Sequence, residues 1–223
     1  DIDVVTAADL ARAELEAALA PAEAVVEAKA NVGDALFQKP EAAYNEYAAK
    51  VDALKNLAAT SKDAEALKAG IEALAEATAA YNAAVNAPEA DAVYSIQLKE
   101  GGMYMTLNEG TKLAEEAMGL SFVAVEGGFA ITNGTEYAAM TGTGNNIWSM
   151  GTATEPYAWV VTAMPNGYYT IAKASDTAQL IGVDNSAAGS SCYADKTIAK
   201  AGDKAYWTIK KMEPIFTYHV NAA

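Results

Sequence analysis

Three segments in the second half of the sequence repeat one pattern of apolar and turn residues. They begin at Tyr94, Phe129 and Tyr169, about 35 and 40 residues apart, and each opens with an aromatic residue, any residue and then Ile. Alternation of apolar and polar residues between clusters of turn residues indicates short β-strands. Repetition at a nearly constant period predicts three units that fold alike and bury one shared core. This repeat restricts the fold more than any other feature of the chain.

Each unit is also expected to hold a second and a closing strand. The second strands are expected at Tyr104–Leu107, Tyr137–Met140 and Leu180–Val183, and the closing strands from Phe122, Trp159 and Trp207. The letters "EGG" and "MPNG", which separate one unit from the next, have the composition of hairpin turns. The sequence thus predicts three repeats, at about 94–128, 129–168 and 169–212.

Three units of about four short strands resemble a β-trefoil, in particular its ricin-type, lectin-like branch. The resemblance covers roughly 92–212. It implies an all-β trefoil as the second domain, 91–223, and it implies binding of sugars as the usual activity of the family. A β-sandwich whose strands repeat by accident is the alternative fold.

The chain departs from the ricin-type pattern at the positions best known for that family. The closing strand usually carries Gln two residues before an aromatic, and Leu120, Tyr157 and Ala205 stand there. Sugar-binding members usually carry an Asp after the apolar start of the second strand. The third unit has Gly182 at that position and Asp184 two residues later. The resemblance therefore implies a retained scaffold with an eroded sugar site.

Residues 1–90 show a helical period instead. Apolar residues recur at steps of three and four in three segments, which places each set on one stripe of a helix. The stripes are Leu15, Leu19, Ala22 and Val26; Tyr44, Tyr47, Val51, Leu54 and Ala58; and Leu67, Ile71, Leu74, Thr78, Tyr81 and Val85. Short connections between such segments predict an antiparallel three-helix bundle, which we interpret as a stalk or spacer.

Local signals set the expected ends of these helices. Pro40 is expected as the first residue of the second helix, and Thr60–Ser61 are expected to cap the third, with Asp63 in its first turn. Pro88 should end the third helix. Pro21 should kink the first helix or divide it, because proline lacks the N–H that a helix interior needs.

Charge excludes several kinds of partner. The net charge is −14, with 7 basic against 16 acidic residues up to Ala90 and 8 against 13 afterwards. Both parts would repel a phosphate backbone or an anionic membrane, and Arg12 is the one arginine. There is no apolar run long enough to cross a bilayer. We therefore expect a soluble chain without a nucleic-acid partner and without membrane insertion.

Few residues could carry catalysis. His219 is the single histidine and Cys192 the single cysteine, so a histidine-based metal site and a disulfide within the chain are excluded. Glu115 and Glu116 are adjacent and would face opposite sides of a strand. The run Gly142–Asn146 lacks the Lys and the helix of a phosphate loop. We expect no enzyme activity, no catalytic residue, no metal and no cofactor.

Aromatic faces and amide groups remain, and these are the groups with which proteins hold neutral sugars. The candidate binding residues are Tyr137, Asn145, Asn146 and Trp148 in the second unit, and Asp184, Asn185 and Tyr193 in the third. Each also has an ordinary structural explanation, since Trp148 could belong to the core and Asn beside Gly is common in turns.

Two interpretations follow. The preferred one is a non-catalytic bacterial module, extracellular or at the cell surface, in which a helical stalk presents a glycan-binding trefoil. The alternative is a structural or protein-interaction module with a degenerate trefoil, as an accessory part of a larger secreted hydrolase, whose partner would be a surface protein. The tail after Met212 is expected to form one more strand, at 215–220, either at an edge of the trefoil or at the start of something further.

Overall fold

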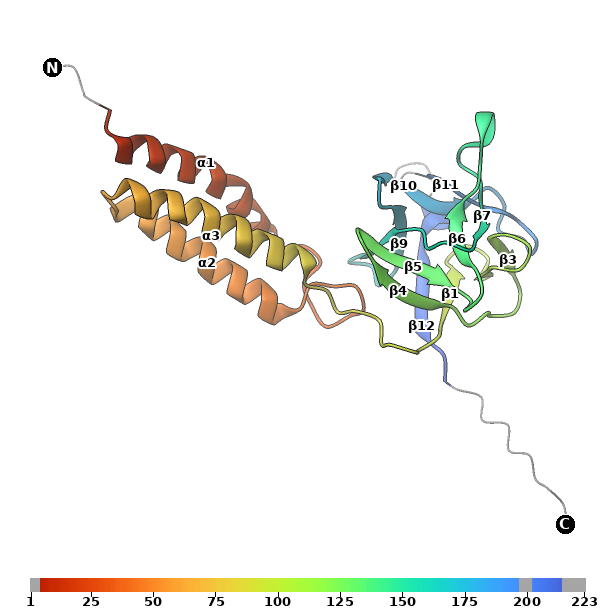
Figure 1. The fold of residues 1–223 in the computed structure, drawn as a ribbon. Helices are drawn as coiled ribbons and strands as arrows, with labels where there is room; N and C mark the ends of the chain where they lie inside the picture. The colour runs from red at the N-terminus through yellow and green to blue at the C-terminus, as the bar shows by residue number, and fades with distance from the viewer. Residues whose placement is uncertain (1–4, 197–201, 214–223) are drawn as a thin grey trace, which may run out of the picture. The chain divides into compact units, whose positions relative to one another are not determined.

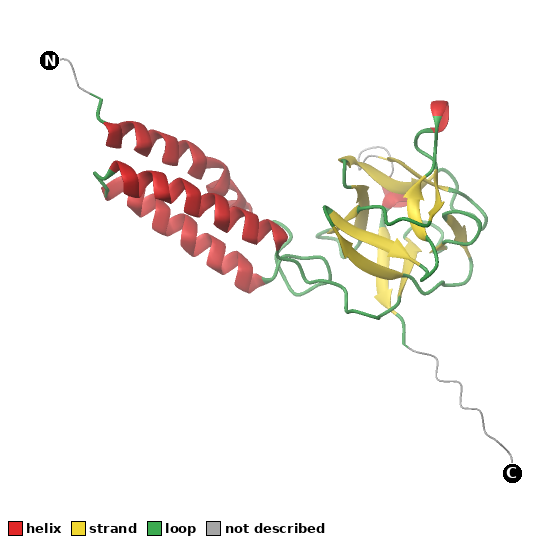
Figure 2. Cartoon of the chain, in the orientation of Figure 1, coloured by secondary structure: helices red, strands yellow, loops and turns green. Residues whose placement is uncertain are grey.

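The fold was analysed in a computed structural model that describes residues 5–196 and 202–213, except for the side chains of Asn145 and Lys196. The chain separates into two compact units, Asp1–Ala87 and Pro88–Ala223. Unit 1 is helical and unit 2 is built of strands, as the ribbon and its colouring by secondary structure show (Figures 1 and 2). The strand expected at 215–220, with His219, lies outside the described residues.

Unit 1 holds α1 (Ala7–Ala28), α2 (Glu41–Thr60) and α3 (Ala64–Ala83). The three helices share one apolar core. Most members of the expected stripes are buried there: Leu15, Leu19, Ala22, Tyr47, Val51, Leu54, Ala58, Leu67, Leu74 and Tyr81. The rings of Tyr47 and Tyr81 stack with their centroids 4.7 Å apart. Because the stripes come from a period of 3.6 residues, the sequence predicts this core well.

The N-caps differ in part from expectation. Asp63 itself is the N-cap of α3, and its Oδ1 accepts hydrogen bonds from the N–H groups of Glu65 (2.9 Å) and Ala66 (3.4 Å). Thr60 instead donates to the carbonyl of Asn56 within α2. A carboxylate suits the N-cap because it also complements the positive end of the helix dipole. The expectation that Thr60–Ser61 cap α3 is therefore wrong.

Pro21 does not divide its helix, and Pro40 and Pro88 lie differently from the sequence prediction. α1 continues through Pro21. Pro21 and Ala17 are both exposed, so water can reach the carbonyl that loses its partner. Pro40 is the N-cap residue of α2, one position before the helix. α3 ends at Ala83, before Pro88, and the backbone of Asn86 then bonds to Phe37 and Gln38 of the α1–α2 loop.

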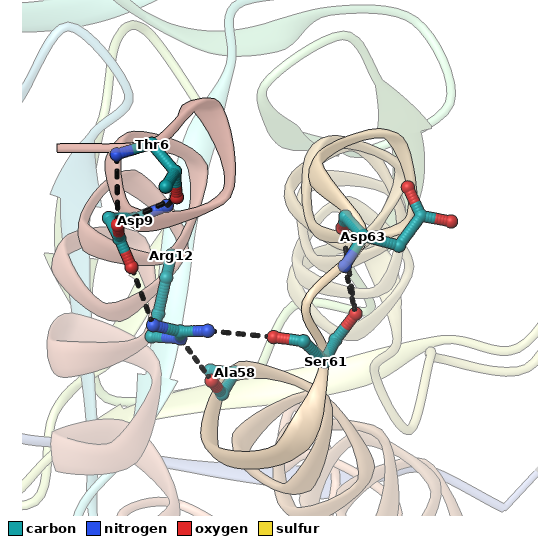
Figure 3. Close-up of polar contacts among 6 residues, drawn as sticks. All are labelled: Thr6, Asp9, Arg12, Ala58, Ser61 and Asp63. Carbon is teal, nitrogen blue, oxygen red and sulfur yellow. Dashed lines mark hydrogen bonds and ion pairs between the residues drawn. The ribbon is translucent and has the colours of Figure 1, made fainter. Parts of the chain in front are cut away.

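Arg12 ties the start of α1 to the end of α2 (Figure 3). Its Nε donates to the carbonyl of Ala58 over 2.9 Å and its Nη2 to the carbonyl of Ser61 over 2.7 Å. Its Nη1 lies 3.2 Å from a carboxylate oxygen of Asp9. The last carbonyls of a helix have no partner within the helix, so this guanidinium satisfies groups that would otherwise depend on water.

Unit 2 holds a 12-stranded sheet in which all strand pairs are antiparallel. The strands are β1 (Tyr94–Leu98), β2 (Tyr104–Thr106), β3 (Lys112–Ala114), β4 (Ser121–Val125), β5 (Gly128–Thr132), β6 (Tyr137–Met140), β7 (Met150–Ala153), β8 (Trp159–Ala163), β9 (Tyr169–Lys173), β10 (Asp176–Val183), β11 (Cys192–Lys196) and β12 (Trp207–Lys211). Every strand expected at 94–212 coincides with one of them.

The strand pairing repeats three times. The pairs β1–β12, β4–β5 and β8–β9 each extend over five residues, and the hairpins β2–β3, β6–β7 and β10–β11 project from them. Six strands thereby form a ring. It is completed by the pairs Tyr94–Leu120, Phe129–Trp159 and Tyr169–Trp207.

These pairs correct the sequence alignment of the three repeats. Leu120, not Phe122, occupies the position of Trp159 and Trp207, and all three are 0% exposed. Phe122 lies two residues further along the strand and therefore on the same face; it meets the ring of Tyr94 edge-on, 5.6 Å between centroids. The residue two positions before Leu120 is Met118, so the first repeat again lacks the Gln.

Candidate functional site

The loop between β6 and β7 forms a compact turn at the tip of a projecting hairpin (Figure 1). The N–H groups of Thr141 and Gly142 both donate to the carbonyl of Ser149, each over 3.1 Å. Within the loop, the single 3-10 turn η1 spans Gly144–Asn146, and Ser149 N–H donates to the carbonyl of Asn146 over 3.0 Å. A Cβ added to Gly142 would lie 1.7 Å from the carbonyl oxygen of Asn146, so this turn requires glycine.

Trp148 is presented at the base of this turn. Trp148 as a whole residue is 36% exposed, whereas Trp159 and Trp207 are 0% exposed. The carbonyl of Trp148 accepts a hydrogen bond from Ala194 N–H over 2.9 Å, and Ser149 forms an antiparallel bridge with Tyr193. The Lys173 ammonium lies 5.7 Å from the centroid of the indole ring. Residues of β9 and β11, in the third repeat, therefore hold Trp148 through its backbone and place one cation over its indole ring.

Tyr193 pairs with Ser149, the residue that follows Trp148. It is half-buried and pairs with Gly182 across the β10–β11 hairpin. Asp184 and Asn185 are both exposed and follow β10 directly. The carbonyl of Asp184 accepts from Lys204 Nζ over 2.8 Å, and Asn185 Oδ1 accepts from Ala187 N–H over 3.2 Å, which is turn chemistry.

The remaining candidates separate into two groups. Asn146 is exposed and lies two residues before Trp148. Asn145 has its backbone in η1 and its side chain lies outside the description. Tyr137 starts β6 and pairs with Thr132 and Ala153, at the opposite end of the hairpin from the Met140–Met150 pair that precedes the turn. The structure therefore does not bring Tyr137 together with Trp148.

A second aromatic group, which the sequence did not single out, surrounds Lys99. Its Nζ lies 4.8 Å from the ring centroid of Tyr168, 5.7 Å from that of Tyr206 and 2.7 Å from Asp203 Oδ1. The hydrogen bond with Asp203 is the main cause that raises the pKa of Lys99. Since the Lys99 ammonium already contacts both rings and the Asp203 carboxylate, we interpret this group as stabilising the fold rather than binding a ligand.

Cys192 carries the one thiol of the chain. Burial raises the pKa of the Cys192 thiol to about 12, so it is a poor nucleophile. Within the described parts of the chain, no group of three or more His, Cys, Asp or Glu side chains is placed to hold a metal ion. Among the helices of those same residues, none is long and apolar enough to cross a membrane.

Comparison with known proteins gives likenesses of fold only. No family model and no curated protein matches the sequence. A ricin B-like lectin of Macrolepiota procera, solved with lactose, is 13% identical over 54% of this chain and 95% of its own, with a TM-score of 0.47. ThreeFoil, a designed 3-fold symmetric protein, is 11% identical over 52% of this chain and 96% of its own, with a TM-score of 0.41.

A mosquitocidal holotoxin is 16% identical over 59% of this chain, with a TM-score of 0.48. The chain spans only 18% of that protein. Because all three TM-scores are below 0.5, the function proposed for this chain rests on its own strand pairing and side chains.

Proposed function

We propose that unit 2 is a β-trefoil of three repeats and unit 1 an antiparallel three-helix bundle. Two observations support this. The same strand pairing occurs three times and closes a six-stranded ring, which is the arrangement that three trefoil units require. In unit 1, Arg12 joins the start of α1 to the last turn of α2, as expected for neighbours that run in opposite directions.

We propose further that the trefoil binds glycans without catalysis, and that Trp148 is its central contact. The exposure of this indole is the observation that carries the proposal. Because Trp148 is exposed, it lacks the hydrophobic stabilisation that Trp159 and Trp207 have in the core. A ligand that covers the face of its indole would supply this stabilisation on binding. Asn146 in the same turn and Tyr193, which pairs with Ser149, offer an amide and a hydroxyl to sugar hydroxyls.

The cellular setting is part of the same proposal. A sugar-binding head on an acidic helical stalk suits a bacterial protein that is secreted or held at the cell surface, where glycans are the partners at hand. The acidic charge of both units disfavours nucleic acid and anionic lipid as alternatives.

A structural or protein-interaction role is the second candidate, and the residues in place of the ricin-type motif favour it. Met118, Tyr157 and Ala205 replace the expected Gln. Gly182 is buried and pairs with Tyr193, so it supplies no carboxylate. In this case the chain would serve as an accessory part of a larger secreted hydrolase, and its partner would be a surface protein.

A glycan array separates the two candidates. We expect the 223-residue chain to bind a defined set of glycans and the Trp148→Ala variant to lose that binding. Val123→Ala is the matched control, because Val123 is 42% exposed on β4, away from the β6–β7 turn. A silent array at high protein concentration would favour the structural role.

A further inference from the structure

Unit 1 contains an open apolar groove between α1 and α3. Its volume is about 560 Å³. The lining is mostly small and apolar: Ala18, Pro21, Ala22, Val25, Tyr47, Ile71, Leu74, Ala75, Thr78, Ala79, Tyr81 and Asn82. A second groove of about 310 Å³ also has Val25 and Tyr81 in its lining, so the two grooves adjoin at these residues. Volumes of 300 to 1,000 Å³ are typical of small-molecule sites.

The second groove adds two polar residues to the lining. They are Asn31 and Lys39, both from the loop between α1 and α2, and they lie beside Ala24, Ala28 and Ala30. Lys39 Nζ donates to the carbonyl of Asn82 over 2.5 Å and lies 5.5 Å from the ring centroid of Tyr81. Asn31 Nδ2 donates to the carbonyl of Phe37 over 3.3 Å, but its Oδ1 is buried without a hydrogen-bond partner.

Lys39 differs from several lysines of unit 1 in its charge environment. Lys29, Lys55 and Lys68 each lie within 3.3 Å of a glutamate oxygen. Among the residues that the structure describes, no carboxylate lies within ion-pair distance of Lys39, and its burial lowers its pKa. A half-buried ammonium that faces a groove without a counter-ion favours an anionic ligand.

We propose that this groove binds a long-chain carboxylate, whose tail lies between α1 and α3 and whose carboxylate pairs with the Lys39 ammonium. The apolar lining accounts for the tail and Lys39 for the head group. A basic helix of another protein, which the acidic surface would attract, fits less well. No Asp or Glu lines either groove, and Lys39 would repel its charge.

Carboxylates of different chain length, titrated into the full chain, test whether the groove binds an apolar tail. Dodecanoate, decanoate and octanoate, each below its micellar concentration, are titrated by calorimetry. We expect the affinity to fall about fourfold for each methylene removed, because each buried methylene contributes a nearly constant transfer free energy. Dodecanol should bind more weakly than dodecanoate, and dodecyltrimethylammonium more weakly still.

Variants locate the ligand. Lys39→Gln should weaken dodecanoate about tenfold, the usual loss for a charged hydrogen bond, and should leave dodecanol unchanged. Ala75→Phe should block both ligands, because Ala75 is an exposed lining residue of the groove. Ala69→Phe is the matched control, since Ala69 is exposed on the same helix and lines neither groove. Circular dichroism checks that each variant is folded.

Several results would overturn the proposal. The proposal is wrong if dodecanoate does not bind below its micellar concentration, or if dodecyltrimethylammonium binds as tightly as dodecanoate. The proposal is also wrong if Lys39→Gln folds and binds dodecanoate as tightly as the wild type does. Lys39 would then only cap the end of α3. A third contrary result is that dodecanoate does not bind, whereas a basic amphipathic peptide binds and loses this binding in Ala75→Phe. The groove would then be a docking site for a helix. If Lys39→Gln does not fold, the chain-length series and Ala75→Phe decide.

Discussion

The indole N–H of Trp159 donates a hydrogen bond to the carbonyl oxygen of Ala138 over 2.9 Å in the core of unit 2. Trp207 makes the corresponding bond to the carbonyl of Ile181 over 3.0 Å. In both repeats the closing strand thus holds the second strand through one side chain. The first repeat has Leu120 at this position, which fills the space without an N–H to donate.

Replacing either buried tryptophan should destabilise unit 2 by a similar amount. Trp159→Phe and Trp207→Phe each remove an N–H from a buried carbonyl and leave a small cavity, for a loss of about 2–4 kcal/mol. Trp148→Phe should change the free energy of unfolding by less than about 0.5 kcal/mol, as is usual at the surface. Urea denaturation followed by fluorescence measures all three. A Trp148 variant as unstable as the other two would contradict the assignment of core and surface.

Arg12→Lys should destabilise unit 1 by about 1–2 kcal/mol, because an ammonium cannot reach two carbonyls in the fixed fork of a guanidinium. Far-UV circular dichroism at 222 nm reports on the helices during thermal unfolding. Lys68→Gln is the control, since Lys68 has only an exposed pair with Glu65. If both variants unfold at the wild-type temperature, the bonds of Arg12 to Ala58 and Ser61 contribute nothing to stability.

The pH dependence of unit 1 should carry a contribution from Asp9. The hydrogen bond from the Thr6 hydroxyl, then that from the Thr6 N–H and the charge of Arg12, lower the pKa of Asp9 below its ordinary 3.8. A carboxylate whose pKa is lower when folded stabilises above its unfolded pKa and loses that contribution as the pH falls through the folded pKa. The melting temperature should therefore fall less steeply below pH 4 in Asp9→Asn than in wild type. Parallel curves would contradict this.

Cys192 should report on the opening of unit 2. It is 0% exposed and its thiol has a pKa of about 12, so at pH 8 it is protonated and inaccessible. Labelling by Ellman's reagent should be slow in buffer and should accelerate in urea together with the loss of tertiary structure. Labelling in buffer as fast as that of glutathione would show that the β11 region opens independently. Above the ordinary thiol pKa of 9.0, unfolding should become easier, since only the unfolded thiol ionises there.

The strands with clear alternation could be predicted from the sequence, whereas β3, β7 and β11 could not. Lys112–Ala114 is only three residues long and Met150–Ala153 contains Gly151, so neither shows a period of two. The register of the first repeat was also beyond prediction. Phe122 resembles the tryptophans in chemistry, but pairing with Tyr94 selects Leu120.

The candidate site could be predicted only in part, because it is built by contacts between repeats. Aromatic and amide residues near turns made Trp148 and Asn146 candidates. The contacts of Trp148, however, come from β9 and β11, so no spacing along the chain relates Lys173 or Ala194 to it. Lys39 likewise gave no signal beyond its place before Pro40, since its environment depends on the end of α3.

The indole signals in a ¹H–¹⁵N NMR spectrum test the central claim most directly. The N–H groups of Trp159 and Trp207 are buried and bonded, so their signals should exchange slowly with solvent, whereas that of Trp148 should exchange fast. Titration with a panel of mono- and disaccharides should shift the fast-exchanging signal and leave the two slow ones in place. If every sugar, at millimolar concentration, leaves the Trp148 indole unmoved, unit 2 does not bind glycans through this surface.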